Sequence, residues 1–185
     1  MNGVTNAVVK IRSIINIIIF VVVLGALAVA GYFYFFTSKE LKSDDGRFSV
    51  SIPGKYSFKA NDKADDSYGM AVYEPNKGLY IFGKTYDLTE GDMLASTNED
   101  KVKFVESAKG RNASEVVEKD INGLKGYTYN FEYTDSNNEN YFMKVIWIKG
   151  KKGTYLLDVE CPTAKKGTYE KELDKIANTF KELEA

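Results

Sequence analysis

The chain has 185 residues, and its charge is nearly balanced between 25 basic and 26 acidic side chains. It contains one cysteine and no histidine. The charge balance excludes the strong basic excess typical of nucleic-acid binders. The lack of histidine removes the commonest general base, the usual zinc ligand and every Ser-His-Asp or Cys-His triad. A single cysteine excludes an internal disulfide.

Residues 14–36 form an uncharged and strongly apolar stretch. A helix of this length spans roughly 34 Å at about 1.5 Å per residue, which is enough to cross a hydrocarbon core about 30 Å thick. Tyr32 and Tyr34 stand near its end, where an interfacial aromatic belt would lie. We therefore expect residues 1–13 to be a short tail and residues 14–36 to be one transmembrane anchor in the lipid bilayer.

A cleaved signal peptide is the alternative, because Ala28-Val29-Ala30 fits the rule of small residues around a cleavage site. The apolar run continues to Phe36, beyond the usual length of a signal peptide, so we favour an uncleaved anchor. Basic residues flank both ends of the stretch, so the positive-inside rule does not decide which end faces the cytoplasm. A short basic tail before an apolar run is typical of an export signal. We expect a single-pass protein of the cell membrane, with its domain outside the cytoplasm.

Residues 37–45 are predicted to be a polar stalk, and residues 46–185 a single α+β domain. Alternation in residues 47–52 places three apolar side chains on one face of a strand. The turn Pro75-Asn76-Lys77-Gly78 predicts a hairpin between residues 68–74 and 79–87. Good helix formers and capping spacings predict a helix within residues 89–109.

The second half of the domain is predicted to be a meander of strands followed by a helix. The expected strands are residues 115–120, 124–133, 141–149 and 154–161. Asn122-Gly123 has the composition of a tight hairpin turn. Residues 141–149 are apolar on both faces, which indicates a central strand covered on both sides. The closing helix is marked by apolar residues at steps of four and three, namely Tyr169, Leu173, Ile176, Phe180 and Leu183.

Three segments carry a resemblance to a known family: Phe-Ser-Val-Ser-Ile-Pro at 48–53, Ile-Asn-Gly-Leu-Lys-Gly-Tyr at 121–127, and Ile-Ala-Asn-Thr-Phe at 176–180. Together with the order of elements, they make residues 46–183 resemble the PsbP-like superfamily. That group includes the photosystem II extrinsic protein, a small Ran-binding nuclear factor and many anchored bacterial proteins. The resemblance implies an antiparallel β-sheet flanked by helices, as an α/β/α sandwich.

The same resemblance implies a partner-binding scaffold without enzymatic activity. Photosynthetic members of the superfamily are associated with histidine-containing metal sites, and this chain has no histidine to supply one. No Ran-binding motif can be matched either. We therefore predict no catalytic, cofactor-binding or metal-ligating residues, and no cofactor.

Cys161 and two groups of acids are the remaining candidates for chemistry. Cys161 shares its strand face with Tyr155, Leu157 and Val159, so a buried apolar role is favoured over a reactive thiol. The acids lack the fixed spacing and glycine turn of a calcium loop, and solvated carboxylates are the better interpretation. They are Asp62, Asp65, Asp66, Glu90 and Asp92.

Aromatic residues at Tyr127, Tyr129, Phe131 and Tyr133 share one face of a predicted strand. Tyrosine is favoured at recognition surfaces, so this face could bind a ligand or partner. Tyrosine also suits half-buried strands in general, and this second interpretation is favoured. The sequon Asn112-Ala-Ser114 has meaning only in a eukaryotic secretory pathway.

The leading hypothesis is a membrane-anchored, extracytoplasmic binding or accessory module with a protein partner in the envelope and no catalytic activity. One alternative is a carboxylate-dependent hydrolase acting on cell-envelope polymers, which would need two acids converging in a cleft, one of them kept protonated by burial. Another is a structural subunit whose anchor pairs within the membrane through small residues such as Gly25 and Ala28.

Overall fold

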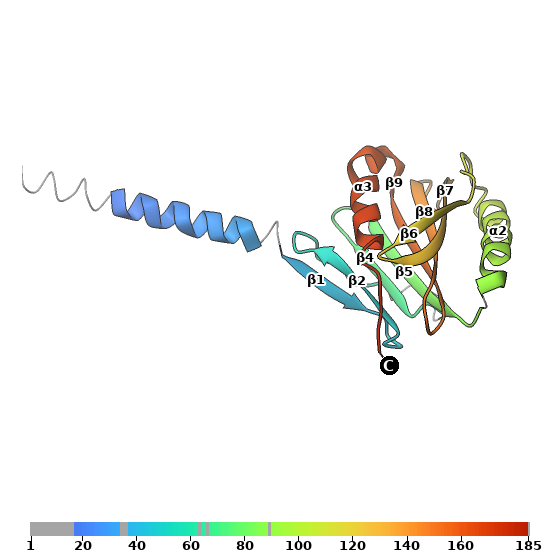
Figure 1. Ribbon diagram of the computed structural model, residues 1–185. Helices are drawn as coiled ribbons and strands as arrows, with labels where there is room; N and C mark the ends of the chain where they lie inside the picture. The colour runs from blue at the N-terminus through green and yellow to red at the C-terminus, as the bar shows by residue number, and fades with distance from the viewer. Residues whose placement is uncertain (1–16, 34–36, 63, 66, 89, 185) are drawn as a thin grey trace, which may run out of the picture. The chain divides into compact units, whose positions relative to one another are not determined.

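The computed structural model describes residues 17–33, 37–62, 64–65, 67–88 and 90–184 (Figure 1). Residues 17–33 are helical. The expected tail at 1–13 and both ends of the expected anchor, 14–16 and 34–36, lie outside the described residues. Within the described residues, no helix combines the length and the apolar character needed to cross a membrane. The chain divides into one unit that contains the N-terminal helix and a second unit, the domain, of Lys39–Ile52 and Tyr56–Ala185.

Seven strands of the described domain form one antiparallel sheet in the order β3-β4-β5-β9-β8-β7-β6. The predicted hairpins and meander are all present. The bounds are β3 Lys59–Ala60, β4 Met70–Glu74, β5 Leu79–Tyr86, β6 Val117–Ile121, β7 Leu124–Thr134, β8 Asn140–Lys149 and β9 Thr154–Pro162. Asn122 and Gly123 both have positive φ, at 53° and 81°, as the predicted turn between β6 and β7 requires.

Helices cover the two faces of this sheet (Figure 1). Helix α3, Lys166–Ala177, packs on one face with Phe142, Ile146 and Leu157. Helix α2, Glu90–Ser107, lies on the other face, where Met93 joins a second core with Trp147. Strand β8 contributes buried side chains to both cores, as its two apolar faces predict. The α+β class with an antiparallel sheet flanked by helices is therefore confirmed.

A second sheet has three strands in the order β1-β2-β10 and includes part of the segment predicted to be a polar stalk, residues 37–45. Residues Ser38–Lys42 form β1, a strand that the sequence did not predict, and pair with β2, Phe48–Pro53. The polar side chains of β1 are mostly exposed, which explains why apolar alternation did not reveal the strand. Phe48 of β2 is fully buried in the core beneath α3.

The closing helix ends earlier than its apolar stripe predicts. Helix α3 stops at Ala177, and Lys181–Glu182 form strand β10, which pairs with β2. The Thr179 hydroxyl accepts a hydrogen bond from the Ser51 N–H at 2.7 Å, and this contact holds the chain in an extended path beside β2. Phe180 is still fully buried, although it lies beyond the helix.

Gly83 on β5 provides a stability test of the packing between the two sheets. A Cβ at this position would overlap the ring of Phe48. Gly83→Ala is therefore expected to lower the free energy of unfolding by about 1–3 kcal/mol. Gly167→Ala in α3 is the matched control, because its Cβ would meet open space and alanine favours a helix by up to about 1 kcal/mol. Urea denaturation measures both, and equal stabilities for the two variants would contradict this packing.

Candidate functional site

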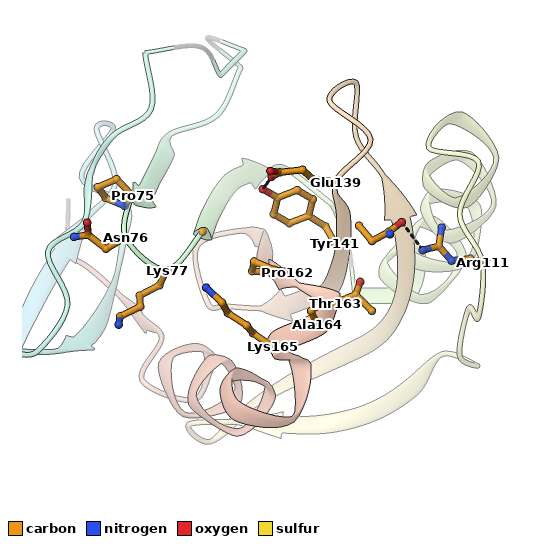
Figure 2. Close-up of a pocket in the computed structure, with 12 residues that line it drawn as sticks. Pro75, Asn76, Lys77, Arg111, Glu139, Tyr141, Pro162, Thr163, Ala164 and Lys165 are labelled. Carbon is orange, nitrogen blue, oxygen red and sulfur yellow. Dashed lines mark hydrogen bonds between the residues drawn. The ribbon is translucent and has the colours of Figure 1, made fainter.

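A groove of about 540 Å³ opens at one edge of the domain, where three separate segments meet (Figure 2). They are the β4–β5 turn at 75–78, the start of β8 together with Glu139 just before it, and the end of β9 together with residues 163–165. Arg111 also lines the groove. Gly78 has a φ of 69°, and a Cβ there would lie 3.1 Å from the Pro162 ring. Glycine thus allows the turn to pack closely against the end of β9, which forms one wall of the groove.

Hydrogen bonds fix the side chains along the β8 side of the groove. The Arg111 guanidinium donates to the Thr134 hydroxyl at 3.0 Å and to the Asn140 amide oxygen at 2.7 Å. The Tyr141 hydroxyl donates to the Glu139 carboxylate at 3.0 Å. Burial, followed by this bond to Glu139, raises the pKa of Tyr141, so its hydroxyl stays protonated. The lining therefore offers amides, hydroxyls, ammonium groups, a guanidinium, a carboxylate and an aromatic ring, all of which can contact a polar ligand.

Three carboxyl groups form a second cluster on the α2 side of the sheet, which we call the acid–tyrosine cluster: Asp100, Asp158 and Glu160, with Tyr129 and Tyr133. Tyr129 donates to Asp100 at 2.6 Å, and Tyr133 donates to Glu160 at 2.7 Å. The Trp147 indole N–H also donates to Asp100, at 3.1 Å. Asp158 is 1 % exposed, and among the described residues its Oδ1 has no hydrogen-bond partner.

Burial raises the pKa of all three acids. Desolvation raises the pKa of Glu160 to about 7, against the opposing effect of the bond from Tyr133. Desolvation, with repulsion from Asp100 and Glu160, raises the pKa of Asp158 well above its usual range. Desolvation also raises the pKa of Asp100, although Tyr129 and Trp147 stabilise its charge. Asp100 lines a pocket of about 230 Å³, whereas Asp158 and Glu160 line neither that pocket nor the groove.

The structure places Cys161 and some of the candidate acids from the sequence. Cys161 is fully buried in the core beneath α3, and burial raises its pKa to about 11, so the apolar interpretation is confirmed. Asp65 accepts a backbone hydrogen bond from Ser67, and Asp62 lines a small pocket with Tyr73 and Tyr80. Asp66 and the side chain of Glu90 lie outside what the structure describes. Among the described residues, no group of three or more acids, cysteines or histidines could hold a metal ion.

The aromatic face of β7 is mostly core. Tyr127, Tyr129 and Phe131 are at most 8 % exposed, because α2 packs over them. Tyr133 is half-buried. The favoured interpretation, that these tyrosines serve strand packing, therefore describes this face better than an open recognition surface does.

Sequence reasoning missed both the groove and the acid–tyrosine cluster. The groove depends on side chains from three segments far apart in the chain, and no local motif marks them. Asp158 and Glu160 did carry a signal, because they interrupt the apolar strand 154–161 on the face opposite Tyr155. The apolar face of that strand gives the stronger pattern, and it conceals the two acids.

Comparisons with known proteins identify the fold. No known family pattern matches the sequence, and no curated protein does either. The solved structure of cyanobacterial PsbP (CyanoP) from Synechocystis sp. PCC 6803 matches with a TM-score of 0.56 at 12 % identity, over 80 % of this chain and 93 % of that one. The fold is PsbP-like.

A protein from Bacteroides thetaiotaomicron VPI-5482 also matches, with a TM-score of 0.52 and 11 % identity. The match covers 79 % of this chain, which spans 48 % of that protein. At such low identity the likeness shows the fold alone. The function of this PsbP-like domain has to be argued from its own groove and cluster.

Proposed function

We propose that this protein is an accessory binding module, held at the cell membrane by residues 14–36, whose PsbP-like domain lies outside the cytoplasm and binds its ligand or envelope partner without covalent chemistry. The observation that carries the proposal is the groove of Figure 2, which is large enough for a small ligand or a polymer unit. Its walls present amide, hydroxyl and ammonium groups beside an aromatic ring, which suits recognition.

The apolar N-terminal segment supports attachment to a membrane. Large apolar side chains are exposed along the described helix at 17–33, including Ile18, Val22 and Leu27. A helix that is apolar all round requires a lipid or protein environment. Attachment through this segment would display the domain at the membrane surface, where an envelope partner could reach the groove.

Carboxylate-dependent hydrolysis of envelope polymers is the second candidate, because the acid–tyrosine cluster holds acids with raised pKa values. A hydrolase of this type needs one protonated acid and a second carboxylate on either side of the scissile bond. Asp158 and Glu160 are buried, and the groove is lined by neither of them. The binding function is therefore better supported.

Protease added to intact cells, or to spheroplasts where an outer membrane is present, tests the orientation. The domain should be degraded while a cytoplasmic marker protein survives, since an exported domain is reached without lysis. Detergent lysis should then make the marker protein accessible as well. Protection of the domain until lysis would place it in the cytoplasm and refute this part of the proposal.

A further inference from the structure

The lining of the groove has a different charge from the chain as a whole. Three basic side chains, Lys77, Arg111 and Lys165, face one acidic side chain, Glu139, whereas the whole chain has 25 basic and 26 acidic residues. A concave surface lined by one sign of charge concentrates ligands of the opposite sign. The groove is therefore suited to an anion.

The charged side chains of the groove differ in whether they already have a partner within the protein. The Glu139 carboxylate accepts the Tyr141 hydroxyl, and the Arg111 guanidinium is held by Thr134 and Asn140, with a Glu132 oxygen 3.8 Å away. Lys77 and Lys165 are exposed, and among the described residues their side-chain ammonium groups form no ion pair or hydrogen bond. Figure 2 shows Lys165 extending towards the turn that carries Lys77. These two ammonium groups are left for a ligand.

The other groups that line the groove show which features besides negative charge a ligand should have. The Thr163 hydroxyl oxygen is buried at the groove, and among the described residues it has no hydrogen-bond partner. A hydroxyl both donates and accepts, and the Asn76 amide is also part of the lining. The Tyr141 ring and two prolines supply apolar surface. A ligand that suits these groups combines an anionic group with a polar group for Thr163 or Asn76 and with apolar surface, and a charged sugar unit has all three.

We propose that the groove binds an anionic saccharide, meaning a sugar unit that bears a carboxylate or phosphate, with Lys77 and Lys165 holding the anion and Thr163 bonding a hydroxyl. Ammonium groups form charge-assisted hydrogen bonds with such anions. Attachment of the domain to a membrane would place this groove beside envelope polymers. The inference rests on the proposed binding function, and it adds the class of ligand.

The test titrates the full chain in detergent with polygalacturonate, neutral dextran and inorganic polyphosphate. We expect binding of polygalacturonate that weakens as salt is added and little binding of dextran. Lys77→Gln/Lys165→Gln should weaken polygalacturonate binding by at least about tenfold, because both ligand-facing charges are lost. Thr163→Val should weaken polygalacturonate more than polyphosphate, since only the sugar offers a hydroxyl to this side chain.

The matched control is Lys59→Gln/Lys171→Gln, which removes two exposed lysines away from the groove. It should change binding less than about twofold. An equal loss in this control, or equally tight binding of polyphosphate, would show bulk charge attraction and overturn the proposal. If polygalacturonate does not bind while the Lys77→Gln/Lys165→Gln chain loses its native envelope partner, the ligand class is wrong and the binding function stands.

Discussion

Replacement of Phe180 by alanine is expected to lower the free energy of unfolding by about 3–5 kcal/mol, the range for a fully buried aromatic ring. Phe180 is 0 % exposed. Its ring lies 5.7 Å from that of Phe48 on β2 and 5.1 Å from that of Tyr155 on β9, measured between centroids. It thus joins the small sheet to the large one, and its removal leaves a cavity between the two.

Lys175→Ala is the matched control, because Lys175 is exposed on α3 and surface changes of this kind stay within about 0.5 kcal/mol. Denaturation in urea, followed by circular dichroism, measures both variants. Similar small losses for Phe180→Ala and Lys175→Ala would mean that the C-terminal segment does not pack against the sheets.

Raising the pH from 5 to 8 is expected to destabilise the domain through the acid–tyrosine cluster. Glu160 has a pKa of about 7 in the folded protein against 4.5 as its ordinary value. The folded state therefore holds this proton more tightly than the unfolded chain does. The stability it contributes is complete below pH 4.5 and is lost as the pH rises through 7. The loss is roughly 3 kcal/mol for Glu160 alone, and Asp158 acts in the same direction.

Glu160→Gln isolates this effect, because glutamine keeps a polar partner for Tyr133 but does not titrate. The free energy of unfolding, measured by urea denaturation at several pH values, should fall less for Glu160→Gln than for the wild-type protein between pH 5 and 8. Asp45, Asp174 and Glu182 have lowered pKa values, so their contribution is lost at acidic pH, outside this window. Parallel pH profiles for the two proteins would contradict the burial of an ionisable Glu160.

Much of the fold follows from local patterns in the sequence. The two apolar faces of residues 141–149 predicted a central strand, and Asn122-Gly123 predicted a tight turn. The structure contains both. The end of α3 could not be predicted in the same way, because the hydrogen bond between Ser51 and Thr179 joins residues 128 positions apart. The apolar step to Phe180 has helical spacing, yet this residue is buried from an extended segment.

The candidate site depends on long-range contacts even more strongly. Lys77, Arg111 and Lys165 are ordinary exposed residues in the sequence. The packing of Gly78 against Pro162 brings the segments of Lys77 and Lys165 together, and the contacts of Arg111 with Thr134 and Asn140 hold it beside them. The acid–tyrosine cluster likewise requires α2 to cover the sheet. The absence of histidine excluded several classes of enzyme, but it could not indicate where the groove or the acid–tyrosine cluster lies.

Binding without cleavage is the central claim, and one measurement tests it directly. The wild-type chain and two variants, Lys77→Gln/Lys165→Gln and Asp100→Asn, are incubated with envelope polymers from the organism's own cells, and both bound polymer and new reducing ends are quantified. The account predicts that the wild type and Asp100→Asn bind polymer, that the double lysine variant binds much less, and that no reducing ends appear. New reducing ends that form with the wild type and disappear with Asp100→Asn would contradict the account and establish a hydrolase.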